Sequence, residues 1–190
     1  MAKTPSRMLP LGTILPTFAL PAPEGSEGRL GVKITSGEVM GTKGLLVIFM
    51  CNHCPYVKHI AKPMSDLTKE FLAAEIGCVG INSNDATRYP EDSPAKMVAE
   101  GKLQDYRFPY LFDQDQCVAR AFDAACTPEF YLFDRNQRLV YRGQFDESRP
   151  GNGVPVTGQD LRAAGMALIA GRPISDDQKP SIGCNIKWLS

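Results

Sequence analysis

The chain has 190 residues, of which 43% are hydrophobic and 22% charged, and its 21 basic residues balance 21 acidic ones. Because roughly 100–200 residues make one domain, we expect a single domain spanning residues 1–190. The balanced charge excludes the basic surface that nucleic acids and anionic membranes attract, so we expect neither partner. The longest apolar run, residues 45–51, is far shorter than the roughly 20 residues of a membrane-spanning helix.

The first ten residues start with a positive charge but are interrupted by prolines before an apolar segment develops. This pattern does not match a secretory signal, which needs an apolar segment of about 7–15 residues. Six cysteines in 190 residues are also too few for a disulfide scaffold. We therefore expect a cytoplasmic protein whose cysteines are free thiols unless they react.

Residues 1–43 form an N-terminal extension in this interpretation. Within it, residues 31–34 and 38–40 flank Ser36-Gly37, which predicts a hairpin. The apolar run 45–50 that follows does not alternate with polar residues, and this is typical of a strand covered on both faces.

A strand, a helix and a second strand follow one another in the first half of the core. Apolar residues recur every three or four positions from about 55 to 74, which predicts an amphipathic helix. Residues 78–83 then predict a second buried strand, and the three elements together predict a βαβ unit. A polar loop, residues 84–92, leads to a helix that begins at Ser93-Pro94.

The second half of the core changes to short strands and a final helix. Segments 128–134 and 138–144 predict an antiparallel hairpin. The remaining elements are a strand at 108–113, a helix from Asp115 to about Phe122, and a terminal helix over 161–169 that stops at Gly171. We therefore expect a core of residues 44–171 and a polar tail of residues 172–190.

The segment Cys51-Asn-His-Cys54 carries the strongest chemical signal. It lies directly after a buried strand and directly before an amphipathic helix. At a helix N-terminus the free amide groups and the helix dipole stabilise a thiolate, which lowers its pKa. From position alone we expect Cys51 to be the exposed nucleophile and Cys54 to be the shielded thiol that resolves a mixed disulfide. A charged His53 would favour the reduced form; a solvent-facing residue without influence is the alternative.

Five segments of the chain resemble a known family. They are FMCNHCPYVKHI, GINSND, ACTPEFYLFD, RGQFDESRP and PSIGCNIKW. They resemble a peroxiredoxin-like branch of the thioredoxin superfamily, related to the alkyl hydroperoxide reductase and thiol-specific antioxidant group. The resemblance implies an α/β thioredoxin-like fold with a mixed sheet flanked by helices. It also implies that Thr127-Pro128 matches the cis-proline position, which faces the dithiol; an ordinary trans proline is the alternative.

The chain departs from true peroxiredoxins in the motif around the reactive cysteine. Those proteins have the pattern Pro-x-x-x-Thr/Ser-x-x-Cys, and if Cys54 is aligned with its cysteine, Val47 and Cys51 occupy the proline and hydroxyl positions. The hydroxyl that would bond the peroxide is therefore missing from the motif. This favours disulfide exchange over peroxide reduction.

The other cysteines carry weaker signals. Cys78, in a predicted strand, and Cys117, on a predicted helix, are typical of small buried hydrophobic residues. Cys126 precedes Thr127-Pro128, so it is either a third redox thiol or a packing residue. Cys184 lies in the polar tail; we expect an exposed or tail-packed cysteine, and a resolving thiol is the alternative.

A metal site is the rival interpretation of the same motif. Cys51, His53 and Cys54 are ligand types that zinc accepts, but a closed zinc site needs four ligands, and His59 is the only other histidine. Copper delivery would also need a distant histidine. We therefore expect no metal.

The sequence as a whole predicts a thiol–disulfide oxidoreductase whose only redox group is its dithiol, so no separate cofactor is expected. Its substrate would be a disulfide in a protein or small molecule, and an external thiol would reduce it again. The alternative is a thiol-dependent antioxidant peroxidase that uses the same cysteines, with a peroxide as the substrate.

Overall fold

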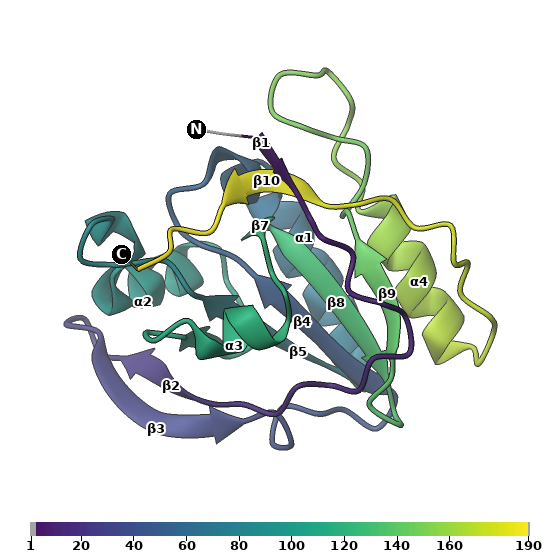
Figure 1. Ribbon diagram of the computed structural model, residues 1–190, viewed down its shortest axis with the longest axis horizontal. Coiled ribbons are helices and arrows are strands. Elements are labelled where there is room, and N and C mark those ends of the chain that lie inside the picture. Colours follow the sequence, from purple (N-terminus) through teal and green to yellow (C-terminus); the bar gives the residue numbers. More distant parts are fainter. Residues whose placement is uncertain (1–2, 190) are drawn as a thin grey trace.

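The computed structural model describes residues 3–189, and a five-stranded mixed sheet in the order β6-β5-β4-β8-β9 lies at its centre (Figure 1). Strands β4, β5 and β6 are parallel, and β8 is antiparallel to both β4 and β9. This confirms the mixed sheet, the βαβ unit and the antiparallel hairpin. The bounds are β4 (Gly44–Phe49), β5 (Ile76–Asn82), β6 (Tyr110–Phe112), β8 (Glu129–Asp134) and β9 (Leu139–Gly143).

The central strand β4 is buried along its whole length because both faces of the sheet are covered. Leu46 and Ile48 pack into one hydrophobic cluster, whereas Leu45, Val47 and Phe49 pack into another. Successive side chains of a strand point to opposite faces, so a strand covered on both sides has no polar positions. This explains the unalternating run in the sequence.

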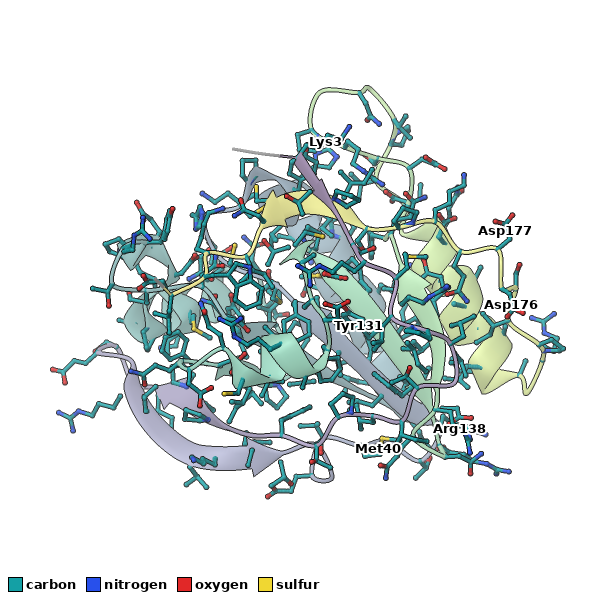
Figure 2. All side chains as sticks on the ribbon, in the orientation of Figure 1. Lys3, Met40, Tyr131, Arg138, Asp176 and Asp177 are labelled. Carbon is teal, nitrogen blue, oxygen red and sulfur yellow. The ribbon has the colours of Figure 1, made fainter. Side chains whose placement is uncertain are left out.

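Helices cover the two faces of the sheet (Figure 1). One cluster joins the sheet to α1 and α4, and the other joins it to α3 and the N-terminal segment. Tyr131, labelled in the interior in Figure 2, belongs to the second cluster, whereas Asp176 and Asp177 lie at the rim. No helix within residues 3–189 is both long and apolar enough to cross a membrane. The helices are α1 (Pro55–Ala73), α2 (Pro94–Leu103), α3 (Cys117–Ala121) and α4 (Gln159–Ile169).

The hairpin in the N-terminal extension differs from the predicted one. Strand β2 (Ala19–Glu24) pairs with β3 (Arg29–Thr35), and residues 36–39 form a turn rather than a second strand. The connecting turn has Gly25 at φ 65° and Gly28 at φ 66°. This left-handed conformation favours glycine. Pro21 and Pro23 within β2 hid the strand from the pattern, because proline is unusual in strands.

The C-terminal tail contributes a strand that the sequence did not predict. Strand β10 (Ile182–Asn185) lies between β1 (Lys3–Pro5) and β7 (Cys126–Thr127) and is antiparallel to both (Figure 1). Lys3, labelled on β1 in Figure 2, is the register partner of Cys184. The tail therefore returns across the molecule to the segment that precedes Pro128.

Gly101 offers a test of the helical assignment of α2. It lies inside α2, and a Cβ added there would meet nothing within 4 Å. Alanine loses less backbone entropy on folding than glycine, so Gly101→Ala should raise the free energy of unfolding by about 0.5–1 kcal/mol. Chemical denaturation measures this change. A lower free energy of unfolding would show that residue 101 is not a helical position with room for a methyl group.

Candidate active site

The two cysteines of the motif lie between the end of β4 and the start of α1. Cys54 is the N-cap residue of α1, and Pro55 occupies the first turn, where its missing N–H leaves no helical bond unmade. Cys51 is 1% exposed and Cys54 is 0% exposed. The expectation that Cys51 is exposed is therefore wrong, because the residues before Pro128 and the C-terminal strand cover the thiols.

Thr127 contacts both thiols of the dithiol. Its hydroxyl oxygen lies 3.3 Å from Cys51 Sγ, and its carbonyl oxygen accepts a hydrogen bond of 3.2 Å from Cys54 Sγ. The Thr127-Pro128 peptide bond is cis, as the resemblance implied. The segment before the proline is therefore the wall against which the dithiol lies.

A third thiol, Cys184, completes a row of sulfur atoms. Cys184 is the register partner of Thr127 and is 2% exposed. With Cys51 and Cys54 it belongs to one buried cluster. Cys184 is not exposed, because the tail strand β10 carries it into the buried cluster of the dithiol.

The row of thiols favours one negative charge, centred on Cys54. Hydrogen bonds from the Cys184 and Cys51 thiols lower the pKa of Cys54, and the backbone N–H of Val57 in the first turn of α1 lowers it further. The hydrogen bond with Cys54, together with burial, raises the pKa of both Cys51 and Cys184. Two neighbouring thiolates repel each other, so the three thiols lose one proton readily and keep the other two.

Asp92, which the sequence interpretation missed, organises the other side of the motif. Its side chain is 0% exposed. Asp92 Oδ1 accepts hydrogen bonds from the backbone N–H groups of Asn52 (2.8 Å) and His53 (3.3 Å), and Oδ2 lies 2.6 Å from His53 Nδ1. A buried carboxylate thus fixes both the backbone of the motif and the orientation of the imidazole.

Two asparagines at the end of β5 hold Asp92 in place. Asn84 Nδ2 donates to Asp92 Oδ2 at 2.7 Å, and Asn82 Nδ2 donates to the Asp92 carbonyl at 3.0 Å. Both asparagines are buried. The sequence offered one signal for this cluster: polar residues that follow a parallel strand lie at the carboxyl edge of the sheet, where α/β proteins place their sites.

His53 is held rather than solvent-facing, so that part of the alternative is wrong. Its side chain is 13% exposed, and its ring stacks on that of Tyr89 at a centroid distance of 5.5 Å. The hydrogen bond to Asp92 raises the pKa of His53, against the opposing effect of burial. Among residues 3–189, nothing bonds its buried Nε2 atom.

The raised pKa of His53 predicts a pH-dependent stability. A group with a raised pKa stabilises the fold fully below its unfolded value, about 6.5 for histidine, and this contribution is lost as the pH rises through the folded value. The unfolding free energy of the wild type should therefore exceed that of His53→Gln most at low pH. Denaturation between about pH 5 and 8 measures the difference, which must shrink with rising pH; growth would contradict the assignment.

The geometry changes the metal interpretation as well. A ring nitrogen of His53, Cys51 Sγ and a carboxylate oxygen of Asp92 lie within 4.8 Å of one another. Asp92 thus replaces Cys54 in the set proposed from the sequence. These donors suit zinc, but they number three where a closed site has four, and Asp92 is already bonded to the imidazole.

The remaining cysteines lie away from the dithiol chemistry. Cys126 is buried with its sulfur 3.8 Å from Glu129 Oε2, and burial raises its pKa. Cys78 is buried in β5, as expected, and burial raises its pKa too. Cys117 is exposed at the start of α3, so the expectation that it is a core residue is wrong. The short helix turns Val118 and Ala119 inward instead.

Comparisons with known proteins agree with this architecture. The model of the AhpC/TSA family matches residues 11–142. An uncharacterized conserved protein from Geobacillus kaustophilus is 48% identical, with a TM-score of 0.94, over 100% of this chain and 97% of that one. A hypothetical protein from Sinorhizobium meliloti 1021 is 45% identical, with a TM-score of 0.92, over 98% and 99%. Among curated proteins, none matches the sequence.

More distant solved structures share the fold alone. Peroxidoxin BcpB from Mycobacterium tuberculosis is 17% identical, with a TM-score of 0.60, over 85% of this chain and 97% of that one. A thioredoxin-family thiol:disulfide interchange protein from Chlorobium tepidum TLS is 16% identical, with a TM-score of 0.61, over 83% and 97%. The thioredoxin-like fold thus accommodates the dithiol, the carboxylate and the third thiol of this chain.

Proposed function

Because the chain belongs to the AhpC/TSA family, and its structural neighbours include a peroxidoxin and a thiol:disulfide interchange protein, we propose that it is a thiol–disulfide oxidoreductase. The observation that carries the proposal is the pair of buried thiols, Cys51 and Cys54, at the start of α1, each in contact with Thr127. Two thiols at this spacing close a disulfide, and the lowered pKa of one supplies the thiolate that exchange requires. No separate cofactor takes part in the proposed reaction.

Cys51 attacks the substrate disulfide, and Cys54 first acts as its base. The Cys51 thiol gives its proton to the Cys54 thiolate as its sulfur bonds to one substrate sulfur, and the other substrate sulfur leaves as a thiolate. The departing substrate thiolate takes this proton from Cys54. The Cys54 thiolate then attacks the Cys51 sulfur and displaces the bound half of the substrate. The products are the Cys51–Cys54 disulfide, one substrate thiol and one substrate thiolate. An external thiol reverses these steps and restores the dithiol.

Cys51 rather than Cys54 makes the attack in this proposal because of what surrounds each sulfur. Cys54 lies between two other thiols, and its sulfur also faces the Thr127 carbonyl and the N–H of Val57. Cys51 has one such thiol neighbour, Cys54. Since both sulfurs are covered, the segment before Pro128 must move to admit a protein disulfide.

His53 and Asp92 act on the pair as positioning residues. The Asp92 carboxylate holds the imidazole and raises its pKa, which favours the imidazolium form near Cys51. A cation there stabilises a thiolate and so favours the reduced dithiol, which raises its reduction potential. Such a dithiol, cycled by an external thiol, suits a reducing compartment, and we place the protein in the cytoplasm.

Trapping experiments with single cysteines test these roles. In a Cys117→Ser background, which removes the exposed thiol, Cys54→Ser should accumulate a mixed disulfide on Cys51 when mixed with insulin as a model protein disulfide. Peptide mass mapping identifies the bond. Faster trapping on Cys54 in Cys51→Ser would reverse the two roles.

A peroxidase is the second candidate, and one feature of the site favours it. Both sulfurs are almost fully covered, so a small oxidant reaches them more easily than a protein does. The Thr127 hydroxyl, 3.3 Å from Cys51 Sγ, supplies the hydroxyl missing from the local motif. In this reaction the Cys54 thiolate takes one peroxide oxygen to form a sulfenic acid and releases hydroxide. Cys51 then displaces water to close the disulfide.

Stopped-flow oxidation separates the two candidates. The reduced background protein is mixed with hydrogen peroxide and, in parallel, with insulin. The oxidoreductase predicts fast exchange through Cys51 and slow peroxide reaction. The peroxidase predicts the opposite order, with first-turnover consumption of peroxide kept in Cys51→Ser and lost in Cys54→Ser.

A further inference from the structure

The short ladder of β7 and β10 places two buried cysteines on opposite faces. Cys184 pairs with Thr127, and Cys126 pairs with Asn185. Register partners in an antiparallel pair project to the same face, and neighbouring residues project to opposite faces. Thr127 turns its hydroxyl to Cys51, so the face that carries Cys184 is the face of the dithiol.

The local contacts agree with this assignment. Cys51, Cys54 and Cys184 belong to one buried cluster, and Cys54 Sγ donates to the carbonyl of Thr127, the register partner of Cys184. Of the three, Cys54 is the thiol whose pKa both others lower. The sulfur of Cys126 instead lies near the Pro128 carbonyl, at 3.9 Å, and the Glu129 carboxylate. Cys54 is therefore the middle thiol, with a potential disulfide partner on either side.

We propose that Cys184 is a third redox-active thiol, which exchanges with the Cys51–Cys54 disulfide to form a Cys54–Cys184 disulfide. The Cys184 sulfur bonds to the Cys54 sulfur, the bond between Cys51 and Cys54 breaks, and the proton of Cys184 passes to Cys51. The step isomerises one disulfide and consumes no further oxidant. It rests on the proposed function, since that exchange supplies the first disulfide.

This exchange moves the disulfide from Cys51 to Cys184 and frees the attacking thiol. In the Cys54–Cys184 form, the site stores two oxidising equivalents between α1 and β10 while Cys51 is again a thiol. The substrate class of this form is therefore an external thiol, whose sulfur attacks the stored disulfide and is oxidised by it. A simple dithiol enzyme offers no free thiol when oxidised.

The test removes Cys51, so that Cys54 must form its disulfide with Cys184. Cys51→Ser in the Cys117→Ser background is oxidised with diamide, a small thiol oxidant, and its disulfides are mapped by mass spectrometry. A Cys54–Cys184 bond is expected, and its absence overturns the proposal. In the background protein oxidised to one disulfide, iodoacetamide should label Cys51 in part of the molecules, and Cys184→Ala should abolish that labelling.

Cys126→Ala is the matched control, because it removes the other buried cysteine of the same ladder. Labelling of Cys51 should be unchanged in this variant; an equal loss would attribute the effect to disturbed packing and overturn the assignment. Cys184→Ser should behave as Cys184→Ala does, and near-ultraviolet circular dichroism confirms that both fold. Failure of the proposed function is seen separately, as the absence of a Cys51–Cys54 bond in the background protein mixed with insulin.

Discussion

Asp92→Ala should lower the free energy of unfolding by about 3–5 kcal/mol, the range found when one partner of a buried charged pair is removed. The carboxylate accepts hydrogen bonds from the backbone N–H groups of Asn52 and His53, from the imidazole, and from the Asn84 amide. The substitution leaves these buried donors without an acceptor, and each lost bond to a charged group costs roughly 1.5–3 kcal/mol. Chemical denaturation of the reduced protein measures the loss.

Two further substitutions, Glu91→Ala and Asp92→Asn, show whether the effect belongs to this carboxylate. Glu91→Ala removes the adjacent exposed side chain and should change stability by less than about 0.5 kcal/mol. Asp92→Asn keeps the shape but removes the charge, so the pKa of His53 should fall, which NMR titration of the ring detects. An Asp92→Ala variant as stable as Glu91→Ala would show that the buried network contributes nothing to folding.

The sequence predicted the elements whose pattern is local. The uninterrupted apolar run of β4 indicates a strand buried on both faces, and the apolar residues of α1, three or four positions apart, indicate a helix buried on one face. Both elements were found where expected. The motif between them was therefore placed at a helix N-terminus before its surroundings were known. The hairpin of β8 and β9 was predicted for the same reason, because its turn residues lie beside its strands.

The parts that the sequence did not predict depend on partners far along the chain. Asp92 lies 40 positions from Asn52, and its role depends on a contact that no periodicity records. Cys184 was assigned to a polar tail because β10 is short and pairs with the short strands β1 and β7. Such a strand leaves no periodic pattern in the sequence. Periodicity reports which face is buried, but not what covers it, and so it also misjudged the exposure of Cys51 and Cys117.

Gly183→Ala should have a large effect on both stability and thiol chemistry. A Cβ at residue 183 would lie 2.0 Å from the Thr127 carbonyl oxygen and 3.2 Å from the Pro128 nitrogen. Since both neighbours are backbone atoms, β10 must move away from β7, and such overpacking costs about 3 kcal/mol, the upper end of the usual range. Gly101→Ala, where the added Cβ meets nothing within 4 Å, is the matched control for the same chemical change.

Displacement of β10 by Gly183→Ala also separates Cys184 from Cys54. The hydrogen bond from Cys184 is the main cause of the lowered pKa of Cys54, so that pKa should rise toward its ordinary value. The rate of alkylation by iodoacetamide, measured against pH in a Cys51→Ser and Cys117→Ser background, reports this change. A variant that loses stability but keeps the alkylation profile would show that β10 supports the fold without tuning the thiols. A rise in the pKa of Cys54, together with loss of the Cys54–Cys184 disulfide after oxidation, would show that the C-terminal strand is part of the redox site.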